Sequence, residues 1–125
     1  MHGALLISKP KNITSFDVIR RLQKHFSGVK MGHLGTLDPM ATGLLPVFLG
    51  KATRLIRYFN ESDKTYEAIL ELGKSSDTFD AEGIIRVHSG IKAPERGALE
   101  ASLQQFLGTH FQIQPPFSAI KRCGR

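Results

Sequence analysis

The stretch GHLGTLDPMATG, residues 32–43, runs directly into the apolar segment LLPVFL, residues 44–49. Three glycines, a proline and several small residues exclude a regular helix or a long strand over residues 32–43, so an irregular loop is predicted there. The apolar segment lies between two glycines and is predicted to form a strand that is buried on both faces. Pro46 within it predicts an edge strand or a bulge, because proline cannot donate a ladder hydrogen bond.

Strand and helix patterns lie on both sides of this stretch. Short apolar or alternating runs predict strands at residues 4–7, 66–72 and 84–88. Helical spacing of apolar residues predicts helices that begin at Thr14, span residues 51–59 and span residues 94–107. Asp17 follows Thr14 at the spacing of a capping box, which supports a helix start there. The pattern predicts an α+β chain with a mixed, mainly antiparallel sheet and flanking helices.

Size and composition limit the possible classes of protein. The chain has 125 residues, of which 41% are hydrophobic and 22% are charged, as in a globular domain. The single cysteine, Cys123, excludes an internal disulfide framework and a cysteine-rich zinc site. The longest uncharged run contains prolines and glycines and does not predict a membrane span. The N-terminal residues do not resemble a signal peptide, so a soluble cytoplasmic protein is expected.

Positive charge is concentrated in the first half of the chain. Residues 1–60 contain nine Lys or Arg and only two Asp, whereas residues 61–125 carry a net charge of −1. The helix that begins at Thr14 and the residues after it supply four of these cations: Arg20, Arg21, Lys24 and Lys30. A one-sided excess of this kind attracts a polyanion such as nucleic acid. A solvated, solubilising surface explains the charge equally well.

Asp38 is the only carboxylate between Asp17 and Glu61. Pro39 restricts the backbone directly after it, so a preorganised loop is expected to present this side chain. A lone carboxylate among Lys and Arg residues is expected to stay ionised, which suits a nucleophile or a general base. The alternative is an aspartate that caps a turn by accepting backbone hydrogen bonds. The residue alone leaves both interpretations open.

The pattern GHxGTLDPxATGxLP over residues 32–46 resembles the catalytic motif of the B-type (TruB) family of tRNA pseudouridine synthases. Four further stretches resemble family motifs, and they follow the family order: GxLxIxKPxxxTS at 3–15, KTY at 64–66, GxxxDTxDxxG at 73–83 and PPxSAxK at 115–121. The motifs extend over nearly the whole chain, so the resemblance is specific.

The resemblance implies a pseudouridine synthase-like catalytic domain that isomerises uridine to pseudouridine, with uridine 55 in the T loop of tRNA as the target. No metal and no organic cofactor are implied, and the expected partner is the T stem-loop of tRNA. The protein is expected to be a monomer with no membrane association. Asp38 would be the nucleophile, either by addition to the uracil ring or by attack on C1′ of the ribose. The uridine must be flipped out of the folded loop for this chemistry.

The resemblance also assigns roles to three further residues. His33 matches a family histidine that supports the remodelled RNA loop, although a histidine in this position could equally be part of an ordinary turn. Tyr66 matches a family tyrosine that stacks on the target base and has been proposed to transfer a proton; without the family it would be read as a buried strand aromatic. Lys64 would either have a structural role or reach a phosphate. The cations Arg20, Arg21, Lys24 and Lys30 would contact the RNA backbone.

Other enzyme classes have less support. The remaining histidines have no metal-ligand spacing, so a zinc deaminase is disfavoured. The glycines of the loop match neither a P-loop nor a dinucleotide fingerprint, and no second carboxylate is close enough in sequence for a glycosidase. Two alternatives stay open: an RNA-guided relative that modifies ribosomal RNA, and a non-catalytic RNA-binding fragment.

Family members are much longer than this chain. Residues 1–125 are therefore expected to form the N-terminal portion of a catalytic domain, with the remainder of that domain and a C-terminal RNA-binding module absent. The missing part would include an arginine that pairs with the catalytic aspartate. The 125-residue chain alone is accordingly expected to be inactive.

Overall fold

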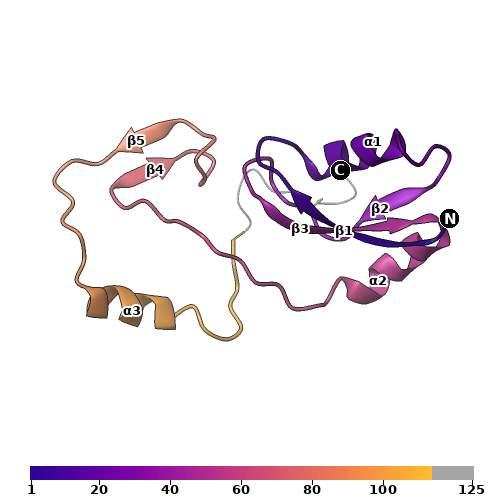
Figure 1. The fold of residues 1–125 in the computed structure, drawn as a ribbon. Helices are drawn as coiled ribbons and strands as arrows, with labels where there is room; N and C mark the ends of the chain where they lie inside the picture. The colour runs from indigo at the N-terminus through magenta and orange to yellow at the C-terminus, as the bar shows by residue number, and fades with distance from the viewer. Residues whose placement is uncertain (114–125) are drawn as a thin grey trace. The chain divides into compact units, whose positions relative to one another are not determined.

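The computed structural model describes residues 1–113 and divides into two compact units (Figure 1). Unit 1 is Met1–Tyr66, and unit 2 begins at Glu67. The PPxSAxK stretch at 115–121 and Cys123 lie outside the described residues.

Unit 1 is built around a three-stranded antiparallel sheet. Its elements are β1 (Gly3–Lys9), α1 (Ser15–Gln23), β2 (Met31–His33), β3 (Gly43–Leu49), the 3-10 helix η1 (Gly50–Leu55) and α2 (Ile56–Phe59). The strand order is β1-β3-β2, so β3 lies in the centre. The strands predicted at 4–7 and 44–49 and the helix predicted from Thr14 are confirmed, while the helix predicted at 51–59 is divided between η1 and α2.

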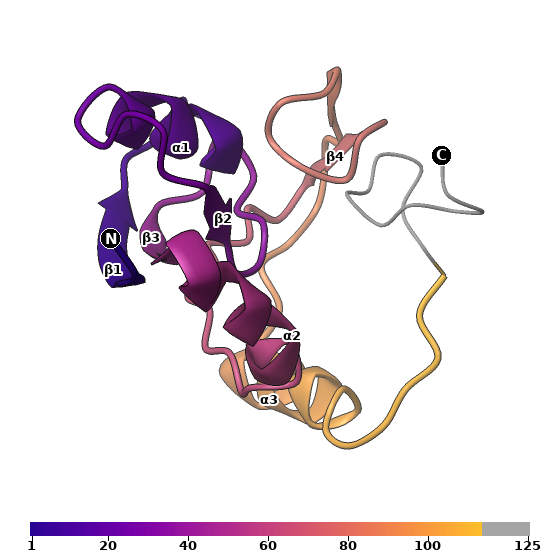
Figure 2. The same ribbon diagram turned by 90° about the vertical axis from the view of Figure 1, so that its right-hand side faces the viewer.

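The core lies between α1 and one face of this sheet. Leu5 pairs with Val47 and Met31 pairs with Leu49, which places these side chains on the same face. The buried side chains of the core are Val18, Ile19, Leu45, Val47 and Leu49. Figures 1 and 2 show α1 on one side of the sheet and α2 on the other. The helix therefore covers the face from which Val47 and Leu49 project.

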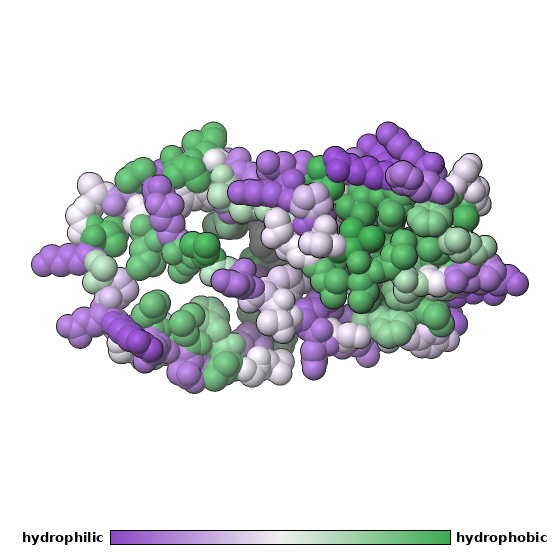
Figure 3. Space-filling view, viewed as in Figure 1, coloured by the Kyte–Doolittle hydropathy of each residue, from purple (hydrophilic) through white to green (hydrophobic). Residues whose placement is uncertain are grey.

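The opposite face of the sheet is covered only in part. The ring of Phe48 packs against Phe59 at the end of α2, with 5.8 Å between the ring centroids. Leu6 and Leu44, on the same face, are 70% and 63% exposed. Apolar atoms gather accordingly over the β1 and β3 region of unit 1 in Figure 3. The prediction that residues 44–49 are buried on both faces is thus correct for Phe48 and wrong for Leu44.

The prediction that Pro46 marks an edge or a bulge is wrong, because β3 is the central strand and its pairing with β1 is uninterrupted from Gly43 to Leu49. β2 pairs with β3 only as far as His33 opposite Val47. The next contact is a single hydrogen bond from the Leu34 N–H to the Pro46 carbonyl, 2.9 Å long. The missing N–H of Pro46 would point to the same side, where the β2 ladder ends. Proline therefore costs at most the reciprocal bond to Leu34, at the very end of the β2 ladder.

The start of α1 is a complete capping box, as predicted. The Asp17 N–H donates to Thr14 Oγ1 at 3.0 Å, and the Thr14 N–H donates to Asp17 Oδ2 at 2.9 Å. Hydrogen bonds from the Thr14 hydroxyl and N–H, together with the Arg20 guanidinium, hold the pKa of Asp17 below its ordinary value.

Unit 2 contains a two-stranded antiparallel sheet and one helix in its described part. The elements are β4 (Lys74–Ser76), β5 (Ile85–Val87) and α3 (Arg96–Gln104). The strand predicted at 84–88 is confirmed at its centre, and the helix predicted at 94–107 is shorter than expected. The strand predicted at 66–72 is wrong, since these residues are not part of any ladder and Ile69 is 97% exposed. Alternation alone does not make a strand, because a strand needs a neighbour with which to exchange hydrogen bonds.

The predicted α+β class is confirmed, and the strand pairs of the described residues are antiparallel. Across residues 1–113, no helix is both long and apolar enough to cross a membrane.

Candidate active site

Asp38 is exposed at the first position of a tight turn. The Ala41 N–H donates to the Asp38 carbonyl at 3.0 Å, and Pro39 occupies the second position, where its fixed φ is favourable. The turn is therefore closed by its backbone. In the described part of the chain, no hydrogen bond engages the Asp38 carboxylate, so the side chain is not used to cap the turn.

The residue before Asp38 is anchored to the start of α1. Ser15 Oγ accepts a hydrogen bond from the Leu37 N–H at 2.9 Å and donates one to the Leu37 carbonyl at 3.1 Å. Ser15 is 2% exposed, so water does not compete for these bonds. The Leu37 side chain packs against the core of unit 1 as a second attachment.

The residue after Asp38 is anchored to the turn between β1 and α1. The Pro39 carbonyl accepts from the Asn12 N–H at 2.8 Å and from Lys9 Nζ at 3.3 Å. Asn12 has a positive φ of 66°, a conformation that asparagine tolerates better than most residues. The backbone is thus held on both sides of Asp38 by residues 9–15.

Lys9 is a structural residue of this site that sequence analysis missed. It is one of the nine Lys or Arg that make residues 1–60 basic, but its side chain is 0% exposed. Its ammonium also donates to the carbonyls of Pro10 at 3.1 Å and Ile13 at 2.7 Å, which satisfies the three donors of a lysine. The alternation of Leu5, Ile7 and Lys9 on the core-facing side of β1 was the signal that could have revealed its burial.

Two glycines give the loop its path. Gly35 has a φ of 72° and Gly43 a φ of 133°, values that residues with a side chain rarely adopt. Gly35 lies where the chain leaves β2, and Gly43 lies where it enters β3. The motif glycines therefore let the loop leave and rejoin the sheet around Asp38.

His33 ends β2 and is half-buried. Its Nδ1 forms a hydrogen bond with the Gly35 carbonyl. A carbonyl only accepts, so Nδ1 carries the proton, and in the neutral ring Nε2 is the acceptor. The ring is thus fixed to the first turn of the Asp38 loop.

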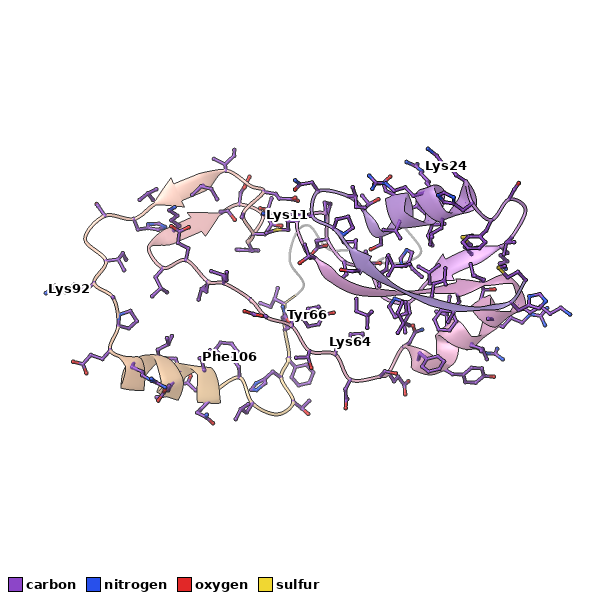
Figure 4. The ribbon with its side chains drawn as sticks, viewed as in Figure 1. Lys11, Lys24, Lys64, Tyr66, Lys92 and Phe106 are labelled. Atoms are coloured by element: carbon purple, nitrogen blue, oxygen red, sulfur yellow. The ribbon has the colours of Figure 1, made fainter. Side chains whose placement is uncertain are left out.

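Lys64 and Tyr66 lie on an extended segment at the end of unit 1 (Figure 4). Lys64 Nζ donates to the carbonyls of Asn60 and Ser62, each at 3.1 Å, just after α2 ends. Tyr66 is 69% exposed, so the interpretation of a buried strand aromatic is wrong. In the described residues, no hydrogen bond or aromatic pair joins Tyr66 to His33 or Asp38. Within residues 1–113, His33 and Asp38 thus belong to one loop, and Tyr66 is not joined to that loop by any of these interactions.

The basic residues of α1 lie on its exposed side. Arg20 forms an ion pair with Asp17 at 3.2 Å, and its guanidinium lies over the Phe16 ring, 4.9 Å from the centroid. Arg21, Lys24 and Lys30 are also exposed, and Figure 4 shows Lys24 projecting away from the helix. The predicted basic surface is therefore present, without Lys9.

The ion pairs found within residues 1–113 are Arg20–Asp17, Lys74–Glu71 and Arg96–Glu100. Asp38 takes part in none of these three. Over the same residues, no three His, Cys, Asp or Glu side chains come together in a group that could hold a metal ion.

Comparison with known proteins places this loop in a family. Residues 20–125 match the model of the TruB family pseudouridylate synthase (N terminal domain). Proteins called tRNA pseudouridine synthase B are similar over almost the whole chain. The one from Dehalococcoides mccartyi is 46% identical over 124 residues, which is 99% of this chain and 41% of that protein.

Two further relatives with the same name come from other bacteria. The Blochmanniella floridana protein is 43% identical over 99% of this chain and 48% of its own length. The Fusobacterium nucleatum protein is 46% identical over 97% of this chain and 42% of its own length. The chain thus spans less than half the length of these relatives. It belongs to the TruB family of pseudouridylate synthases and matches the N-terminal domain of that family.

Proposed function

We propose that this chain is the nucleophile-bearing, N-terminal part of an enzyme that isomerises uridine to pseudouridine in tRNA. The family and the names of the relatives support the reaction and the RNA class. The observation that carries the proposal for this chain is the state of Asp38. Its carboxylate is exposed on a turn that the backbone closes, and the backbone on either side of it is anchored.

Asp38 acts as the nucleophile in this proposal. Its carboxylate adds to the uracil ring or attacks C1′ of the ribose; either route lets the N1–C1′ bond break. The base then rotates and forms a C5–C1′ bond. The bond to Asp38 breaks, which regenerates the carboxylate, the proton on C5 is released to solvent, and N1 takes up a proton. A nucleophile has to be held at the right distance and angle from its target. The anchors at Leu37 and Pro39 supply that constraint from the protein side.

The proposed target is uridine 55 in the T loop, flipped out of its stack to reach Asp38. His33, fixed to the Gly35 carbonyl, would support the rearranged RNA loop. Tyr66 is exposed and can offer its ring to a base, an interaction worth about 1–3 kcal/mol. We assign Lys64 a structural role instead of a phosphate contact, because its ammonium already donates hydrogen bonds to two backbone carbonyls.

The basic side of α1 would bind phosphates near the target. Ser15, at the start of the helix, contacts the residue before Asp38. Lys24 follows nine positions later, which corresponds to about 13 Å along a helix axis. Phosphates a few nucleotides from the flipped uridine can therefore reach Arg20, Arg21 and Lys24. Lys30 follows α1 and would extend the same interface.

The test is the substitution Asp38→Asn in a full-length context, in which the chain replaces the matching 124 residues of the Dehalococcoides mccartyi relative. Asn is nearly isosteric but a far poorer nucleophile. Tritium release from [5-³H]uridine-labelled tRNA should be lost, while tRNA affinity in a gel shift stays within a few fold, because affinity comes mainly from phosphate contacts.

Asp63→Asn is the matched control, since Asp63 is also an exposed aspartate of unit 1. It should leave both readouts unchanged. Substantial turnover by Asp38→Asn would end the assignment of the nucleophile. Binding without any turnover by the parent would favour a non-catalytic RNA-binding protein, and turnover only on ribosomal RNA would favour the RNA-guided alternative.

A further inference from the structure

We infer that Ser15 is a positioning residue for Asp38, acting through its two hydrogen bonds to the Leu37 backbone; this inference rests on the proposed function. Ser15 Oγ accepts from the Leu37 N–H at 2.9 Å and donates to the Leu37 carbonyl at 3.1 Å. A hydroxyl can do both at once, because it has one proton and two lone pairs. Both backbone groups of the residue preceding the nucleophile are therefore held by one side chain.

This arrangement fixes the direction in which Asp38 leaves the loop. The Leu37 carbonyl belongs to the peptide that joins Leu37 to Asp38, so a bond to its oxygen restrains the plane of that peptide. On the other side, the Pro39 carbonyl is held by Asn12 and Lys9. Rotation of the Asp38 backbone is thus opposed at both ends, and the position of the carboxylate depends on the remaining side-chain torsions.

Ser15 is not needed to hold α1 in place. The helix begins with the capping box between Thr14 and Asp17, and it is fixed to the sheet by Val18 and Ile19. The Ser15 hydroxyl contributes to neither and is directed entirely at Leu37. Its 2% exposure also means that a water molecule has little access to replace it. The side chain therefore serves the loop and not the helix.

Loss of this hydroxyl should affect turnover more than binding. The loop keeps its attachment through the Leu37 side chain and through Pro39, so it stays in place with a less restrained peptide before Asp38. Small misplacements of a reacting group reduce rate strongly, by up to about a hundredfold for 1 Å. Contacts with RNA phosphates lie elsewhere and should be retained.

The test compares Ser15→Ala with Thr14→Ala in the same full-length context as the Asp38 variants. Thr14 is the adjacent residue and caps α1, and its side-chain hydrogen bonds among the described residues go to Asp17 and not to Leu37, so Thr14→Ala controls for a weakened helix start. For Ser15→Ala we expect kcat for tritium release to fall about 10- to 100-fold, with KM within about threefold. For Thr14→Ala we expect kcat and KM to stay within about threefold of the parent values, although the loss of the helix cap lowers its thermal midpoint.

Hydrogen exchange gives a second readout that does not depend on turnover. The Leu37 N–H loses its acceptor in Ser15→Ala, so peptides that contain Leu37 should exchange faster, and those of β1 should not. Ser15→Cys, which keeps the side-chain shape but bonds weakly, should be intermediate in kcat and in exchange. It carries the test if Ser15→Ala does not fold.

Equal kcat values for Ser15→Ala and Thr14→Ala would overturn the inference, as would unchanged exchange at Leu37. A parent protein without turnover would instead count against the proposed function. The exchange of the Leu37 amide would then still decide whether Ser15 restrains the loop.

Discussion

The two units of this chain use their apolar residues in opposite ways. In residues 1–113, every buried side chain belongs to unit 1, where β3 packs against α1. The described part of unit 2 contains many large apolar residues, yet Phe79 is 75% exposed and Val87 is 73% exposed. Its sheet has two strands of three residues, and an isolated ladder of that size is marginally stable. Apolar content therefore builds a core only where a helix and a sheet present matching faces.

The N-terminal cap of α1 in unit 1 is also more complete than that of α3 in unit 2. α1 begins with a reciprocal capping box, whereas the residue before α3, Glu95, makes no capping hydrogen bond with its side chain. The helical spacing over residues 94–107 predicts an apolar face that packs inward, yet Leu103 in α3 and Phe106 just after it are both exposed. In unit 1 the helix cap and the apolar pattern fit the observed packing, whereas in unit 2 the apolar pattern is not matched by burial. Unit 1 should therefore be much more stable than the described part of unit 2.

The largest expected effect is in hydrogen exchange. In the 125-residue chain, the amides of β1 and β3 should exchange at least about a thousandfold more slowly than those of residues 66–72, because opening the sheet costs several kcal/mol. Mass spectrometry of peptides from a time course measures both. Equal rates in the two regions would mean that unit 1 has no cooperative core.

Two leucines, one in each unit, differ strongly in burial. Leu45 is 1% exposed in unit 1, and Leu103 is 57% exposed in unit 2. Leu45→Ala should lower the free energy of unfolding by about 2–5 kcal/mol, and Leu103→Ala by no more than about 0.5 kcal/mol. Urea titrations followed by far-UV circular dichroism provide the values. A large loss of stability from Leu103→Ala would mean that α3 buries its apolar face in solution.

The basic surface should also belong to one unit. Replacing Arg20, Arg21 and Lys24 by Gln should reduce the slope of log affinity for tRNA against log salt by about 2–3, if each contacts one phosphate. The control replaces three cations of unit 2, Lys74, Arg86 and Lys92, and should leave the slope nearly unchanged. The reverse result would place the RNA interface on unit 2.

The smallest expected effect concerns two carboxyl groups, one in each unit. A hydrogen bond from a threonine hydroxyl is the main cause that lowers the pKa of Asp17 and of Asp80: Thr14 for the first, Thr78 for the second. A carboxyl group whose pKa is lowered by folding stabilises the folded protein at pH values above its unfolded-state pKa. This stabilisation is lost as the pH falls through the folded-state pKa. Both units should therefore lose this contribution below about pH 4.

Substitutions separate the two sites. Thr14→Ala should raise the pKa of Asp17 only, and Thr78→Ala that of Asp80 only, as followed by NMR of the carboxyl carbons. A shift of both groups by either substitution would show that the two sites are coupled.

Sequence patterns predicted unit 1 better than unit 2, and the reason is physical. The capping box at Thr14 and Asp17 and the apolar run at 44–49 are local signals that the fold uses directly. The alternation at 66–72 is an equally clear signal, but a strand also requires a neighbour, which no local pattern reports. The prediction of an edge strand or a bulge at Pro46 is wrong for a similar reason, because whether a strand tolerates a proline depends on where the neighbouring strand β2 ends.

The sequence locates Asp38 and His33 in the loop, but it does not reveal the residues that hold this loop in place. Asp38 and His33 stand out by their place in the glycine-rich loop, and both lie there in the structure. Ser15 and Lys9 contact that loop from 22 and 30 positions away in sequence. Such contacts depend on how β1 pairs with β3 and on how α1 packs against the sheet, so only the three-dimensional structure reveals them.

The burial of Lys9 has a practical consequence for chemical footprinting. Eight lysines fall within the described residues, and Lys9 alone among them is buried. An amine-reactive reagent should modify the exposed lysines directly and reach Lys9 only when the turn between β1 and α1 opens. The labelling rate of Lys9, measured by mass spectrometry in the absence of RNA, therefore reports how often the turn that holds the Asp38 loop opens.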